Sequence, residues 1–204
     1  MSAQATILEA GDLIDDLVGI EPGSLLDAVR ARRPAARTHA QASYRALLVP
    51  AEAGDVTYAE RFAIAAYVAG LHRAPVSIDH YAAGLREHGG PALADIVAQA
   101  VMETLAEGPV GRFPPGPLSA EDIPAPDFML SAPVAAALGK RLETALAHAH
   151  FLVFHPRDAA ATRFEPLIAA GWSTDALVTL SQLVSFLTFQ IRVVAGLRVL
   201  AATP

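Results

Sequence analysis

Residues 57–90, TYAERFAIAAYVAGLHRAPVSIDHYAAGLREHGG, decide the fold, because they encode a helix, a sharp corner and a second helix that carry most of the candidate chemistry. Thr57 is a typical helix N-cap, and Glu60 follows three residues later, as in a capping box. Pro75 ends the first helix and opens the second. The glycine pair at 89–90 ends the second helix as a C-cap. The pattern predicts two helices joined at a tight corner.

Four side chains of this stretch are candidates for acid–base catalysis. They are a carboxylate, two imidazoles and a phenol: Glu60, His72, His80 and Tyr81. A carboxyl group that is partly removed from water has a raised pKa and can pass a proton. We therefore predict that Glu60 points into a half-buried cleft at the corner, within direct or water-bridged reach of at least one of the other three.

Each of these side chains also has a structural alternative. An acid in the first turn of a helix stabilises the helix dipole, and a histidine at a helix end can hydrogen-bond a backbone carbonyl. Along an ideal helix, Glu60 lies about 18 Å from His72, so these two cannot touch within one helix. A shared site requires that the second helix descends beside the first, or that another half or subunit completes it.

The order of residues in this stretch resembles the carboxymuconolactone decarboxylase and alkylhydroperoxidase D-like superfamily. The resemblance lies in Glu-Arg, a run of small apolar residues, a corner, and a helix opening with His and followed by Ala-Ala-x-Leu. In the thiol peroxidases of that group the corner is Cys-x-x-Cys-x-x-x-His, and an upstream glutamate completes a proton relay. The resemblance matches Glu60 to the glutamate, Ala74 and Ser77 to the two cysteines, and Tyr81 to the histidine, with His80 one residue early. It implies an all-α bundle that lacks the thiols of the peroxidases.

Composition also predicts an all-α protein. Of the 204 residues, 53% are hydrophobic and only 18% are charged, which excludes a disordered chain and requires a large core. Aromatic residues are only 6%, whereas alanine, leucine and valine dominate, which favours closely packed helices over a β-sandwich.

Charge and cysteine content exclude several classes of function. A net charge of −6 without a sustained basic run argues against nucleic-acid binding. The one basic cluster, at 30–37, is expected to be a solvated helix face or a salt-bridge patch between subunits, with an anion site as the alternative. Because the chain has no cysteine, disulfides, thiolate metal sites and thiol redox chemistry are excluded.

The chain divides into four expected segments. These are an N-terminal helical extension (1–50), a first helical half with the degenerate motif (51–107), a Pro/Gly-rich connector (108–131) and a second helical half (132–204). The connector contains six prolines and three glycines between 108 and 126, so we expect it to run extended over the surface. The second half repeats the order helix, His-Pro corner, helix, glycine, helix, which suggests a degenerate internal duplication.

The remaining helices are placed by periodicity, caps and breakers. The expected ranges are 5–20, 24–33, 36–48, 91–106, 133–151, a segment that Asp158 caps and that ends at 170–171, and 173–201. Pro166 should kink or interrupt the segment after Asp158. The start of the chain lacks the basic and apolar regions of a signal peptide, so a cytoplasmic location is the expectation.

The last helix is apolar on nearly every face, so it is expected to lie between other helices. Its most apolar run, 176–191, is interrupted by polar residues and is interpreted as a buried helix and not as a membrane span. A second stripe is expected to face a partner subunit of a homo-oligomer, through Val178, Phe186, Phe189 and Val193.

Other polar residues are weaker candidates. His148 and His150 are two residues apart and face different directions on a helix, so no metal site is predicted, although a loose one with His155 and Asp158 stays an alternative. Ser77 is expected to be an N-cap and not a nucleophile. The single tryptophan is expected in the core, with the wall of a ligand pocket as the alternative.

Three functions remain open from the sequence. The first is a proton-transfer enzyme of the lyase or isomerase type that needs no cofactor and acts on a small carboxylic acid or lactone. The second is a relative of the peroxidases that has lost thiol chemistry and binds a ligand or redox partner. The third is a structural subunit that pairs with a cysteine-bearing relative.

Overall fold

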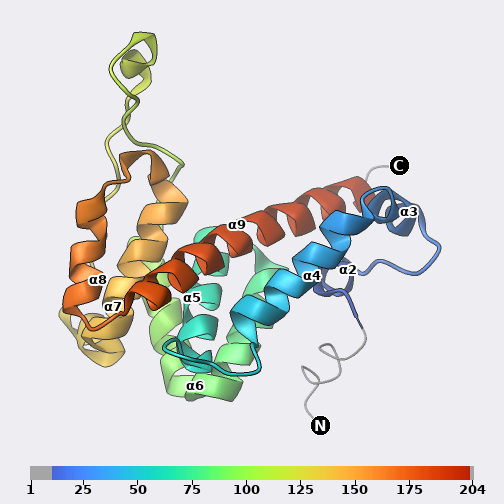
Figure 1. The fold of residues 1–204 in the computed structure, drawn as a ribbon, viewed down its shortest axis with the longest axis horizontal. Helices are drawn as coiled ribbons and strands as arrows, with labels where there is room; N and C mark the ends of the chain where they lie inside the picture. Colours follow the sequence, from blue (N-terminus) through green and yellow to red (C-terminus); the bar gives the residue numbers. More distant parts are fainter. Residues whose placement is uncertain (1–10, 203–204) are drawn as a thin grey trace.

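The structure is a computed structural model that describes residues 11–202. The described chain is all-α, as predicted (Figure 1). The helices are α2 (Leu13–Val18), α3 (Leu25–Ala31), α4 (Pro34–Leu48), α5 (Tyr58–Leu71), α6 (Pro75–Thr104), α7 (Ala132–Phe154), α8 (Glu165–Ala169) and α9 (Thr174–Ala202), and three short 3-10 turns are η1 (Pro117–Glu121), η2 (Pro156–Asp158) and η3 (Ala161–Phe164).

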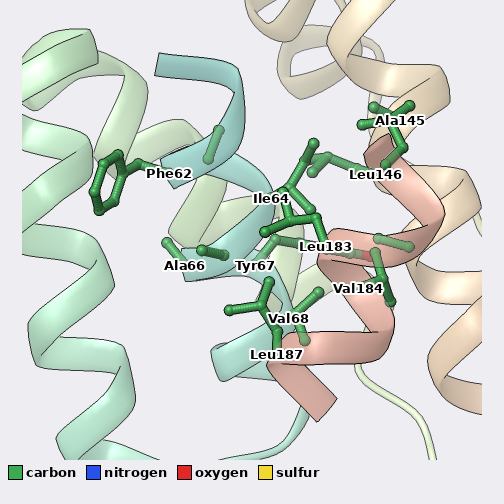
Figure 2. Packing of buried hydrophobic residues seen from close by; sticks show 14 of the residues in the cluster. Phe62, Ile64, Ala66, Tyr67, Val68, Ala145, Leu146, Leu183, Val184 and Leu187 are labelled. Atoms are coloured by element: carbon green, nitrogen blue, oxygen red, sulfur yellow. The ribbon is translucent and has the colours of Figure 1, made fainter. Parts of the chain in front are cut away.

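The helix α5 is the centre of the molecule. Every residue from Arg61 to Leu71 is buried, because α6, α7 and α9 pack around this helix. Figure 2 shows Phe62, Ile64 and Val68 of α5 in the cluster, with Leu146 of α7 and Leu183 and Leu187 of α9 on the opposite side. The capping box of Thr57 and Glu60 is present, which confirms the predicted start of this helix.

The helix α6 runs back along α5 and bends at a glycine. Gly90 has a φ of 84°, a conformation open to glycine but costly for other residues, and Pro91 begins the next helical segment. The predicted end of one helix at 89–90 and the start of the next at Pro91 are therefore confirmed. His88 stacks on Phe62 with ring centroids 5.0 Å apart, so α6 does descend beside α5.

The long helix α9 joins the two ends of the molecule. It lies against α5 and α7 at one end and against α4 and α2 at the other (Figure 1). Of the four residues expected to face a partner, Val178 and Phe189 are exposed, Val193 is half-buried and Phe186 is buried. The contact itself stays a prediction.

By length and composition α9 could cross a membrane, since its most apolar window has a mean hydropathy of 1.6. Apolar core helices pass the same test. The helix α9 contacts four other helices, and 39% of its most apolar window is buried. The test applies to the whole helix and not to the 176–191 run alone, and the interpretation of that run as a packed helix agrees with the contacts.

The N-terminal helices are held together by ion pairs within the chain. Arg30 reaches Asp12 at 2.6 Å and Asp15 at 2.8 Å, and its side chain is only 9% exposed. Arg37 pairs with Asp15 and Asp27. At these two arginines, the expectation of a solvated face or a patch between subunits is wrong, because acids of the same chain neutralise them. The start of the expected 5–20 helix lies outside the described residues.

The connector does not run along the surface as expected, but projects as an arm beyond α7 and α8 (Figure 1). An antiparallel bridge between Gly111 and Ile123 closes the arm at its base. The amide of Val110 donates to the Phe154 carbonyl over 2.7 Å, and Ser131 binds the Glu103 carboxylate. The arm is therefore anchored where it leaves and rejoins the helices.

The middle of the second half differs from the prediction. Asp158 caps no helix, because its carboxylate accepts the amide of Arg112 at the base of the arm over 3.0 Å. Pro166 interrupts nothing, since it stands in the first turn of α8, where its missing N–H costs no hydrogen bond. Two 3-10 turns replace the expected helix before it.

Candidate functional site

The corner between α5 and α6 is formed by four residues. His72 is the C-cap of α5, Arg73 has a left-handed φ of 51°, and Ala74 precedes Pro75 at the first position of α6. A positive φ is uncommon for a residue other than glycine and often marks a functional turn. It allows the chain to reverse within a few residues.

This corner opens on a cavity of about 290 Å³. The corner contributes residues 72–77, and α9 contributes the opposite wall through Ile191, Arg192, Val194, Ala195 and Arg198. Ala74 and Ser77, the positions that the sequence pattern matches to redox cysteines, both line it. Ser77 lies within the helix and is not the predicted N-cap, because Pro75 already occupies the first helical position.

His72 lies at the edge of this cavity. Its Nε2 lies 3.3 Å from the Thr188 hydroxyl of α9, and His72 also lines a second cavity of about 150 Å³. Burial, followed by the positive charge of Arg192, lowers the pKa of His72 from its ordinary value. The ring is therefore neutral at pH 7, the form in which an imidazole accepts a proton.

His80 and Tyr81 belong to a different polar cluster. His80 Nε2 lies 3.1 Å from the hydroxyl of Tyr44 on α4, and burial lowers the pKa of His80 to about 4. Tyr81 is fully buried, donates to Gln190 of α9, and has a raised pKa because of its burial. Neither side chain lines the corner cavity. Their contacts hold α4 and α9 against α6.

Glu60 lies at the opposite end of α5 from the corner. Its carboxylate accepts hydrogen bonds from the amide and hydroxyl of Thr57 and pairs with Arg141 of α7 at 2.7 Å. The predicted contact with His72, His80 or Tyr81 is therefore wrong. The reason is geometric, since α5 separates Glu60 from His72 by its whole length and α6 brings His88, not His80, to its level.

The histidines of the second half do not form a metal site. No cluster of three or more potential ligands occurs within residues 11–202. His148 Nε2 lies 3.0 Å from the Ser181 hydroxyl, and His150 Nε2 lies 3.0 Å from the Thr104 carbonyl. His155 lies 3.4 Å from Asp158, which itself holds the arm. Trp172 is buried and stacks under Arg141, so it is a core residue, as predicted.

Sequence reasoning missed the α9 wall of the cavity. Arg192 and Arg198 are the only charged residues of α9 after its first turn. Two arginines within an otherwise apolar helix are a signal that could have marked this wall, because exposed guanidinium groups can bind an anion. Nothing in the local sequence linked them to His72.

Comparison with known proteins supports the fold. No family model and no curated protein matches the chain. Among solved structures it is similar to the alkylhydroperoxidase AhpD core of an uncharacterized peroxidase-related protein from Ralstonia eutropha JMP134. The two share 19% identity at a TM-score of 0.57, over 93% of this chain and 79% of that one. The chain therefore has the all-α fold of the alkylhydroperoxidase D-like proteins.

Proposed function

We propose that the protein binds a small carboxylic acid or lactone in the corner cavity and transfers a proton on it through His72. The main support is the position of that imidazole: of the four candidates from the sequence, only His72 lines the cavity. Its lowered pKa keeps the ring neutral, and the Thr188 contact fixes its orientation.

The chemistry needs no group beyond the chain. A neutral imidazole accepts the proton from the carbon next to the carbonyl group of the ligand and returns it to the same carbon. In a ligand with a β,γ double bond it can instead return the proton to the γ carbon, and the double bond moves to the α,β position. The first outcome is exchange and the second is isomerisation, and both leave the enzyme unchanged. Glu60, His80 and Tyr81 are structural in this scheme, because each is engaged elsewhere.

A ligand-binding protein without catalysis is the alternative. Ala74 and Ser77 leave the corner without a thiol while they still line a cavity. This combination is what loss of redox chemistry with retention of a binding site would produce.

Proton exchange in D₂O distinguishes the two. Purified protein is incubated with 4-oxopentanoate or γ-butyrolactone, and incorporation of deuterium next to the carbonyl group is followed by NMR. We expect exchange above the buffer rate with at least one probe, and its loss in His72→Gln. His80→Gln is the matched control and should retain exchange. Buffer-rate exchange with both probes, or full activity of His72→Gln, would overturn the proposed proton transfer.

A further inference from the structure

We infer that the corner cavity selects the carboxylate of a small organic acid over a neutral ligand, and that Arg192 and Arg198 of α9 are the residues that select it. The inference rests on the proposed function only in placing the ligand in this cavity. It narrows the choice between an acid and a lactone to the acid.

The first support is the start of α6. Its N-cap, Ala74, provides no side-chain hydrogen bond, and Pro75 has no N–H. The amides of Val76 and Ser77 lie in the first turn, where no carbonyl of the helix can accept them. This end of a long helix also carries the positive end of its dipole. An anion in the cavity would accept hydrogen bonds from these two amides and would interact favourably with the positive end of the dipole.

The second support is Ser77 itself. Its side chain is 1% exposed and lines the cavity. No hydrogen bond of its hydroxyl to another residue occurs in the described part of the chain. The hydroxyl is therefore free to donate to a carboxylate oxygen of a ligand in the cavity.

The third support is the charge on the α9 wall. Arg73 is already paired with Glu107 at 2.8 Å, so its charge is compensated. Within residues 11–202, neither Arg192 nor Arg198 forms an ion pair with a carboxylate. Arg198 reaches only the Leu17 carbonyl, at 3.4 Å. Two guanidinium groups therefore stay available to an anion, and guanidinium groups match carboxylate geometry.

The rest of the lining sets the size and polarity of the ligand. Val76, Ile191, Val194 and Ala195 are apolar, so the body of the ligand must be apolar as well. At about 290 Å³ the cavity lies at the lower limit of small-molecule sites, which are roughly 300–1,000 Å³. These features fit a short aliphatic or aromatic monocarboxylic acid better than inorganic phosphate, which would leave the apolar wall uncovered.

A matched pair of ligands tests the inference. Pentanoate and pentanamide have nearly the same shape and differ in charge, and inorganic phosphate is the third probe. Binding to the full chain is measured by titration with NMR detection, which also reports the pKa of His72. We expect pentanoate to bind at least about tenfold more tightly than pentanamide, since a charge-assisted hydrogen bond contributes about 1.5–3 kcal/mol. Bound carboxylate should also raise the pKa of His72.

Variants locate the site. Arg192→Met and Arg198→Met should each weaken pentanoate binding by about tenfold or more and leave pentanamide binding unchanged. Arg157→Met is the control for net charge, because Arg157 stacks on Phe113 in the arm, away from the cavity. It should not alter the affinity for pentanoate.

Equal affinity for acid and amide, tighter binding of phosphate than of pentanoate, or an equal loss in Arg157→Met would overturn the inference. Failure of the proposed function is distinguishable from failure of the inference. Pentanoate binding without any proton exchange removes only the catalysis. Exchange on the lactone that survives Arg192→Met and Arg198→Met removes only the selection of an acid.

Discussion

The Nε of Arg141 donates to Oε1 of Glu60 over 2.7 Å, an ion pair that joins α5 of the first half to α7 of the second. The same guanidinium donates to the carbonyls of Gly171 and Asp55 and lies 3.7 Å from the centroid of the Trp172 ring. Trp172 in turn donates to the Arg141 carbonyl. Glu60 thus has two structural roles: it completes the capping box of α5, and it pairs with Arg141 of α7.

Removing this carboxylate should cost stability and not ligand binding. Glu60→Ala loses the capping box and the ion pair, and we expect a loss of about 1–2 kcal/mol in the free energy of unfolding. Glu60→Gln should lose less, because its amide oxygen still accepts the Thr57 amide. Urea unfolding measures both. A Glu60→Gln variant of normal stability that no longer exchanges protons on 4-oxopentanoate would restore the catalytic interpretation of Glu60.

Thiol peroxidase activity should be absent. Ala74 and Ser77 stand at the corner and the chain contains no cysteine, so no sulfur can be oxidised by a hydroperoxide and reduced by a dithiol. Consumption of cumene hydroperoxide with dithiothreitol as the donor is the measurement. Turnover above buffer and metal-contaminant controls would contradict this expectation.

Stability should fall in mild acid because of two buried histidines. Burial lowers the pKa of His80 and of His148 from the ordinary 6.5 to about 4. The unfolded chain therefore binds protons at higher pH than the folded chain, and the free energy of unfolding decreases as the pH falls from about 6.5 to about 4. Since one pKa unit corresponds to about 1.4 kcal/mol, the loss should reach a few kcal/mol.

Urea unfolding at pH 7.5 and pH 4.5 checks the sign and size of this effect. The His80→Gln/His148→Gln double variant should show a smaller difference between the two pH values. Part of the difference should remain, because burial also lowers the pKa of His72, His150 and His155. Paired acids such as Asp27 titrate below the pH range in which the histidines titrate, because a backbone hydrogen bond and Arg37 lower the pKa of Asp27 below 3.8. The same loss in wild type and double variant would show that other groups titrate there.

We propose that the chain forms a homo-oligomer through the exposed side of α9. Val178 and Phe189 are 53% and 48% exposed, and Phe189 borders a groove of about 690 Å³ that α4 and α9 line without a charged residue. Large exposed apolar side chains beside an uncharged groove are typical of subunit contacts. Light scattering at low micromolar concentration should give a mass above that of one chain.

Phe189→Glu should shift this mass towards the monomer. Leu118→Glu makes the same kind of change at an exposed position of the arm and serves as the control. A stable wild-type monomer would contradict the proposed oligomer, as would an equal effect of both substitutions.

Local signals in the sequence predicted the helix ends well. Thr57, Ser24 and Ser173 accept the amides of the third residue after them, and Gly90 breaks the helix before Pro91. In each of these caps and breaks the interacting residues lie within a few positions of each other, so the sequence pattern alone reveals them. The all-α fold followed from the same signals and from composition.

The site depended on partners that are distant in the sequence. Glu60 and Arg141 are 81 residues apart, and His72 and Thr188 are 116 apart. No periodicity or cap relates such residues, so the acid in the first turn was matched to the wrong histidines. A repeat of helix order also could not reveal that the middle of the second half forms 3-10 turns around Asp158.

The path of α9 makes the corner dependent on helical register. One uninterrupted helix contributes Thr188 to His72, Gln190 to Tyr81, and the two arginines to the cavity. Each residue of an α-helix turns the chain by about 100°. Insertion of a single residue after Leu183 would therefore rotate all four side chains away together, although the helix itself would remain intact. The contacts of α9 with the corner are therefore more sensitive to a change in its length on this side of the core than to a single substitution.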